Sequence, residues 1–125
     1  MELSRIFIVG FGSLIGGILR YVVSTVSQKY FGGFPVGTLI VNVVGGFLIG
    51  MIMEASASIR PISDDLRTFL TTGIIGGFTT FSTFSYETTC FFTEGEYLIG
   101  VLNAGLNLFL ALFACWLGKM AVQLV

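Results

Sequence analysis

The chain contains no histidine, which excludes enzymes that use a histidine base and metal sites with histidine ligands. Charge is also scarce, because Lys, Arg, Asp and Glu make up only 10% of the residues, against about 25% in an average soluble domain. So few charged residues cannot cover a globule with a water-facing surface. The net charge of −1 further argues against a nucleic-acid partner. We therefore expect a membrane protein.

Cysteine is nearly absent too. Cys90 and Cys115 each lie in an apolar stretch without a second cysteine nearby, which excludes a disulfide framework and a cysteine metal site. The sequence has no G-x-S-x-G motif and no paired acids with room for a water. Residues 10–16 resemble a dinucleotide fingerprint, but no strand–helix–strand unit surrounds them. We expect that the chain is not an enzyme.

Hydrophobic residues are abundant, at 54% of the chain. They form four long stretches, each close to the roughly 20 residues that cross a hydrocarbon core of about 30 Å. The first stretch lacks the small-residue cleavage site of a secretory signal. The pattern predicts an all-α membrane protein in which residues 1–125 form a single domain. Its four transmembrane helices are expected at about 5–27, 35–55, 65–92 and 97–122.

Four crossings place both termini on one side of the membrane. That side carries four cations, Arg5, Arg60, Arg67 and Lys119. The other side carries Lys29, joined by Arg20 if Arg20 lies near its helix end. This positive-inside bias is weak. Such a chain can insert in both orientations, and this would permit an antiparallel dimer.

Glycine is enriched, with 17 residues, about twice the usual share of roughly 7%. Three pairs are spaced four residues apart in three different stretches, Gly12/Gly16, Gly46/Gly50 and Gly73/Gly77. This spacing aligns small residues on one helix face and predicts close helix packing. Such pairs are common in membrane helices and indicate packing rather than activity.

The third stretch, residues 65–92, would extend roughly 42 Å as one straight helix and overshoot the hydrocarbon core. Its middle combines three glycines with adjacent threonines, all poor helix formers. We expect a break near 76–80. Unwound backbone at that depth needs protein, water or an ion to satisfy it, so the break is a candidate ion site.

Two side-chain patterns follow the expected break. Phe81 and Phe84 share one helix face, and Ser82, Ser85 and Thr89 form a hydroxyl stripe on another. Either pattern alone is more typical of packing, with hydroxyls bonded back to their own helix. Together, beside a break, they favour a lined path.

Other polar residues inside the four stretches are Arg20, Asn42, Glu87, Asn103 and Asn107. Each is costly in hydrocarbon and is expected to face a cavity or another polar group. Amide donors and a permanent positive charge favour an anion as ligand. The alternative is that Arg20 extends to the interface and that the asparagines only bond neighbouring helices.

These motifs resemble the CrcB/Fluc family of fluoride channels. The resemblance is carried by GGFTTFSTFS at 76–85, GILR at 17–20 and GTLIVN at 37–42, and it extends to the length and the four-span layout. It implies a channel in the inner cell membrane that exports fluoride passively and relieves its toxicity. It also implies an antiparallel, dual-topology homodimer with two pores and a central structural sodium ion.

The resemblance assigns roles to individual residues of this chain. The backbone carbonyls of Gly76 and Thr79 from both subunits would hold the sodium ion. The pore residues would be Phe81 and Phe84 as lining, Asn42 as a donor to fluoride, Ser82 and Thr83 as a polar track, Arg20 towards a vestibule, and Glu87 and Asn107 near the pore.

Two other classes of small membrane protein share the layout. A small multidrug transporter needs an acidic residue in its first span to bind cations, whereas this chain has Arg20 there. A structural membrane subunit would need neither a hydroxyl stripe nor a broken helix.

Overall fold

The structure, a computed structural model, describes residues 2–125, and all regular structure in this part of the chain is helical. Three helices are long and apolar enough to cross a membrane: α1 (Leu3–Tyr30), α2 (Val36–Ser58) and α6 (Tyr97–Gln123). The remaining crossing is built from shorter pieces, α3 (Asp64–Thr68), the π-helix η1 (Phe69–Ile75), α4 (Gly76–Phe78) and α5 (Ser82–Thr93). The expected all-helical membrane fold with a broken third span is confirmed.

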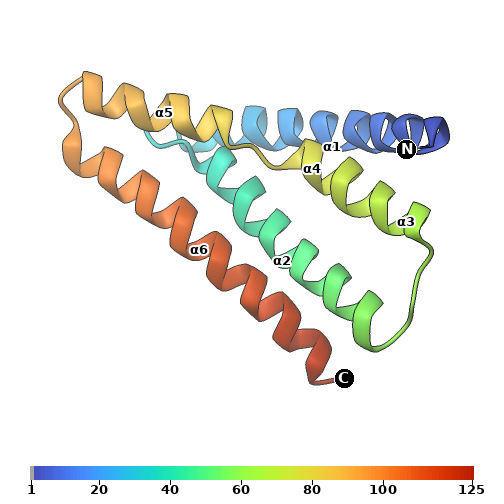
Figure 1. Cartoon of the computed structure of the whole chain (residues 1–125). Coiled ribbons are helices and arrows are strands. Elements are labelled where there is room, and N and C mark those ends of the chain that lie inside the picture. Colours follow the sequence, from blue (N-terminus) through green and yellow to red (C-terminus); the bar gives the residue numbers. More distant parts are fainter. Residues whose placement is uncertain (1) are drawn as a thin grey trace.

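Both chain ends and the connector after α2 lie towards one end of the molecule, and the other two connectors lie towards the opposite end (Figure 1). Helices α3, η1 and α4 form one continuous rod, which a short non-helical link joins to α5 (Figure 1). The main contacts of α2 are with α6, whereas α1 packs against η1 and α4. The break therefore lies among all four crossings.

The interruption of the third span lies nearer the C-terminus than its glycines suggest. Gly76–Phe78 remains helical, and the first extended residue is Thr79, with φ −84° and ψ 161°. The Thr79 N–H still donates to the Ile75 carbonyl at 3.0 Å, which keeps the helix intact up to this point. The non-helical residues are 79–81. Membrane burial thus overrides the poor helix propensity of the two glycines.

Close packing of helix backbones explains the glycine pairs. A Cβ at Gly12 would lie 2.8 Å from the Cα of Gly73, and one at Gly77 would lie 2.7 Å from the Ser13 carbonyl oxygen. A Cβ at Gly46 would lie 2.8 Å from the Ala111 carbonyl oxygen. The predicted tight contacts of the three pairs are confirmed, and they bring α1 onto the rod and α6 onto α2.

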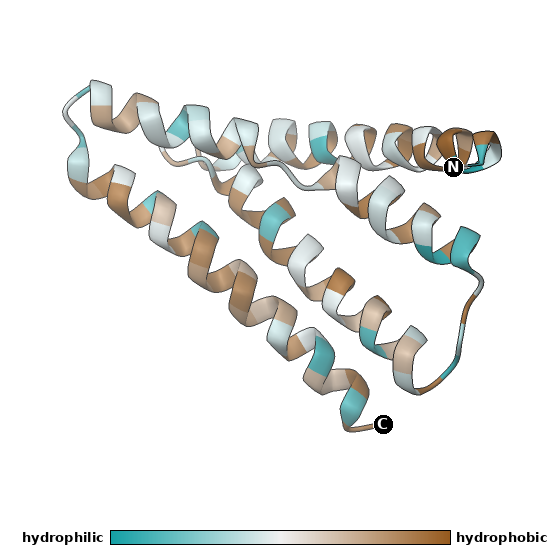
Figure 2. Cartoon of the chain, in the orientation of Figure 1, coloured by the Kyte–Doolittle hydropathy of each residue, from teal (hydrophilic) through white to brown (hydrophobic). Residues whose placement is uncertain are grey.

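The interior of the chain is small and polar, and its exterior is apolar. Val41 and Asn103 are the largest side chains that are fully buried among the described residues. Large apolar side chains such as Phe109 and Trp116 are exposed, and hydrophobic colour dominates α6 while α5 is paler (Figure 2). Lipid solvates apolar side chains as well as a protein core does, so the helices associate through small residues and hydrogen bonds.

Candidate functional site

The candidate site centres on the break, where the side chain of Asn42 pairs with the backbone of Thr80. The Thr80 N–H donates to Asn42 Oδ1 at 2.9 Å, and Asn42 Nδ2 donates to the Thr80 carbonyl at 3.1 Å. One amide therefore satisfies both backbone groups of a non-helical residue, as a neighbouring strand would. Asn42 comes from α2, so this pair joins α2 to the break.

A ladder of hydrogen bonds continues from Asn42 across α6 to α5. Asn42 Nδ2 also donates to Asn107 Oδ1 at 2.9 Å, and Asn107 Nδ2 donates to the Asn103 carbonyl at 2.9 Å. Asn103 Nδ2 donates to Thr88 Oγ1 at 2.9 Å, and Thr88 Oγ1 donates to the Phe84 carbonyl at 2.7 Å. We call these residues the amide ladder. Asn107, expected near the pore, is 5% exposed and bonded on both sides.

The break also removes the helical donors of several carbonyls, among them those of Gly76 and Thr79. In a regular helix Thr80 N–H would donate to Gly76 and Thr83 N–H to Thr79. Here the Thr80 N–H donates to Asn42 Oδ1, and the Thr83 N–H donates to Thr80 Oγ1 at 3.2 Å. These two carbonyls are the ones that the resemblance assigns to sodium.

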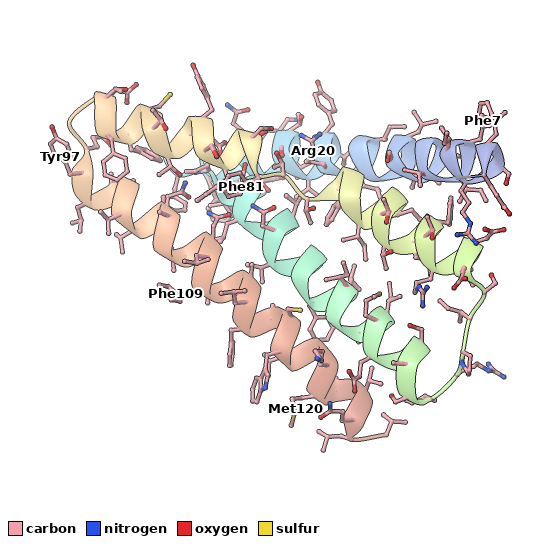
Figure 3. All side chains as sticks on the ribbon, viewed as in Figure 1. Phe7, Arg20, Phe81, Tyr97, Phe109 and Met120 are labelled. Atoms are coloured by element: carbon pink, nitrogen blue, oxygen red, sulfur yellow. The ribbon has the colours of Figure 1, made fainter. Side chains whose placement is uncertain are left out.

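Arg20 of α1 lies beside the break. Its Nε donates to the Gly77 carbonyl at 3.1 Å, and its side chain is half-buried (Figure 3). Gly77 is in the last turn of α4, where the helix dipole favours a positive charge. The structure thus bonds Arg20 to the broken helix, and its place towards a vestibule stays a prediction.

The two phenylalanines lie beside each other at the start of α5. Their ring centroids are 5.5 Å apart and the ring planes are tilted by 54°. Phe84 is half-buried, whereas Phe81 is 78% exposed. Figure 3 labels Phe81 beside the non-helical link. Both rings line a groove of about 560 Å³, together with Asn42, Gly76, Thr79 and Asn107. Most of the predicted site residues therefore meet at this groove.

Glu87 and Thr83 line a second hollow of about 340 Å³, which reaches the connector between α1 and α2. Oε1 of Glu87 is buried and lacks a hydrogen-bond partner among the described residues. This carboxylate lies one turn beyond Thr83 on α5. The start of α5 thus separates the two hollows.

The hydroxyl groups do not form the continuous stripe that we expected. Ser85 Oγ donates to the Phe81 carbonyl at 2.8 Å, so this side chain bonds its own helix. Ser82 is exposed, and its Oγ lies 3.5 Å from Thr80 Oγ1. The hydroxyls of Thr80 and Thr88 make more structural contacts than the stripe residues do. Thr80 stands three residues before Thr83 at a helix start, a capping spacing that could have identified it.

Comparison with known proteins identifies one family. Residues 7–119 match a family model described as CrcB-like protein, Camphor Resistance (CrcB). A protein of Clostridium perfringens named fluoride-specific ion channel FluC is 48% identical, covering 94% of this chain and 93% of the relative. Proteins with the same name are 50% identical in Clostridium novyi, with the same coverage, and 45% identical in Campylobacter jejuni, covering 93% of this chain and 95% of the relative.

The bond of Arg20 to Gly77 gives a testable prediction. Arg20→Met keeps the aliphatic stem but leaves a carbonyl without its partner inside the membrane, so we expect a loss of about 1–3 kcal/mol in unfolding free energy. Thermal unfolding of the purified protein in detergent measures this loss. Arg60→Met, at an exposed arginine in a connector, is the matched control and should leave stability unchanged. Equal stability of both variants would contradict a structural role for Arg20.

Proposed function

The chain belongs to the CrcB-like family, and on that premise we propose that it is a fluoride-selective channel that exports fluoride passively. It is a multi-pass membrane protein and not an enzyme. Hydrogen fluoride enters a cell as a neutral acid and ionises inside, so a channel lets the trapped anion leave down its gradient. The inner cell membrane is the location that this role requires.

The observation that carries the proposal is the grouping of ring edges, hydroxyls and an amide at one break in the membrane. Fluoride is small and strongly hydrated, and its dehydration is prohibitive unless donors replace the lost water. The positive edges of Phe81 and Phe84 attract an anion without binding it tightly, which permits conduction. Ser82 and Thr83 supply hydroxyl groups beside them.

We infer that the ion passes between the two hollows at the start of α5. Thr83 and Glu87 line one hollow, and Phe81 and Phe84 line the other. A route past these residues crosses the one part of the third span where helical hydrogen bonding is interrupted. Arg20 of α1, which bonds the Gly77 carbonyl in α4, adds a fixed positive charge near this route, which favours an anion over a cation.

Asn42 contributes to this route only by exchanging partners. An amide nitrogen carries two hydrogens, and in Asn42 these donate to Thr80 and Asn107. Donation to fluoride therefore requires one of the two bonds to open as the ion arrives. If the bond to Asn107 opens, the Thr80 backbone at the break stays paired with Asn42.

We further infer an antiparallel homodimer with two pores. The exposure of Phe81 and the open groove around it support a second copy, because one chain alone does not enclose the rings. The other large partner of the protein is the lipid bilayer, which solvates the apolar faces of α1 and α6.

A structural sodium ion fits the two carbonyls at the break. Gly76 and Thr79 both line the groove, and their helical donors are engaged elsewhere. Unwound carbonyls at such a break are ligands for a monovalent cation. When bound, the ion would supply positive charge to these oxygens and join two subunits, and it would have no part in transport.

Fluoride efflux from liposomes that contain the purified protein tests the main proposal. We expect an electrode to record fluoride release that depends on a potassium ionophore for charge balance, with little release of chloride under the same gradient. The hydrogen-bond donors and ring edges of the proposed pore match the smaller fluoride ion better than chloride. Equal fluoride and chloride rates would reject selectivity, and no fluoride release would reject the proposed function.

The two phenylalanines give a second test. Phe81→Ile or Phe84→Ile removes ring-edge contacts worth about 1 kcal/mol each and should slow fluoride efflux about fivefold. The variants should elute from a sizing column like the original protein. Phe109→Ile, an exposed phenylalanine on α6, is the control and should keep the original rate. If both variants keep the original rate, neither ring lines the pore.

Sodium dependence tests the proposed ion. We expect thermal unfolding of the purified protein to occur at a higher temperature in sodium chloride than in N-methylglucamine chloride of equal ionic strength. Binding to the folded state alone stabilises a protein by about 2.7 kcal/mol at a hundredfold excess over Kd. Identical unfolding temperatures in the two salts would argue that no sodium is held at Gly76 and Thr79.

A further inference from the structure

The segment that carries the two phenylalanines is held by side chains at both of its ends. Before Phe81, the backbone of Thr80 is paired with Asn42. One turn after Phe84, the hydroxyl of Thr88 accepts a hydrogen bond from Asn103 at 2.9 Å. The amide ladder therefore starts and ends on the same short stretch of the third span.

We propose that Asn103 and Thr88 are positioning residues that set the place of the Phe84 ring in the pore. This inference rests on the proposed function and extends it to residues that do not touch the ion. Asn103 is 0% exposed and Thr88 is 9% exposed. Neither residue lines either hollow. Any effect on permeation must therefore pass through another residue.

The contact from Thr88 to Phe84 gives the route of this effect. Residues four apart share one helix face, and Thr88 Oγ1 donates to the Phe84 carbonyl at 2.7 Å. The Thr88 hydroxyl is thus held between a donor on α6 and an acceptor on α5. Because the bond to Phe84 lies within α5, the bond from Asn103 is the one that holds this turn of α5 against α6.

The direction of the ladder makes this arrangement specific. Every link from Asn42 to Thr88 donates towards α5, and the final acceptor is the Phe84 carbonyl. Loss of the Thr88 hydroxyl removes the acceptor for a fully buried Asn103 amide, which must then rotate or draw in water. Either change shifts α5 relative to α6. The Phe84 ring would follow that shift, whereas residues on α1 would not.

The test combines fluoride efflux with a direct probe of the ring. Thr88→Val keeps the shape of the side chain and removes only the hydroxyl, and Asn103→Leu removes the amide. We expect each variant to slow fluoride efflux about tenfold, as the loss of one buried hydrogen bond allows. The double variant should be no slower than either single variant, because both remove the same contact. Thr88→Ser, which keeps the hydroxyl, should restore the rate.

Fluorine NMR of the full-length protein with 4-fluorophenylalanine at position 84 reports the ring without reference to transport. Thr88→Val should change its chemical shift, and Thr88→Ser should return it towards the original value. Thr93→Val is the matched control, because Thr93 also lies on α5, is exposed, and has a hydroxyl that bonds the Cys90 carbonyl of its own helix. It should change neither the rate nor the shift.

Each outcome has one meaning. Original efflux rates and an unchanged ring signal in Thr88→Val would overturn the positioning role while the original protein still conducts fluoride. An original protein that conducts no fluoride would instead overturn the proposed function, and the NMR comparison would still decide the positioning role. Should Asn103→Leu fail to fold, Thr88→Val and Thr88→Ser carry the test alone. Slowing by Thr93→Val equal to that by Thr88→Val would also reject it.

Discussion

Every backbone group that leaves the helix at residues 79–81 has to find a partner inside the membrane, and the surrounding residues are arranged by this requirement. An unpaired N–H or carbonyl in hydrocarbon is expensive because no water reaches it. Asn42 takes both groups of Thr80, and Arg20 takes the Gly77 carbonyl. The partners come from α2 and α1, so a local interruption links three crossings. Among the groups left over are the Gly76 and Thr79 carbonyls, which we propose as ligands for a cation.

Short side chains can serve as these partners only if the helices approach closely. Glycine at the contacts allows it, since a Cβ at Gly12 or Gly77 would lie within 3 Å of backbone on the facing helix. The same approach leaves room in the interior for amides and hydroxyls rather than large apolar groups. Polar contacts therefore determine how the helices pack together, and the exposed apolar surface makes the protein soluble in lipid.

The general architecture could be predicted from the sequence because it depends on local patterns. Apolar length located the crossings, and the four-residue spacing of Gly73 and Gly77 predicted a close helix contact, which the structure makes with α1. The position of the interruption could not be read in the same way, because Thr80 leaves the helix for a partner 38 residues away in the chain. Ser85 was expected in a hydroxyl stripe and instead bonds its own helix. Thr88 was overlooked because its importance depends on where α6 places Asn103.

The hydrogen bonds of the amide ladder have a consequence for the evolution of this sequence. Asn42 donates to the side chain of Asn107, and Asn103 donates to the hydroxyl of Thr88, so a replacement on one side of either bond leaves the other side without its partner. A change at Asn103 would then be tolerated mainly when Thr88 changes with it, and a change at Asn42 when Asn107 does. Among related sequences, substitutions at these positions should therefore occur together rather than independently.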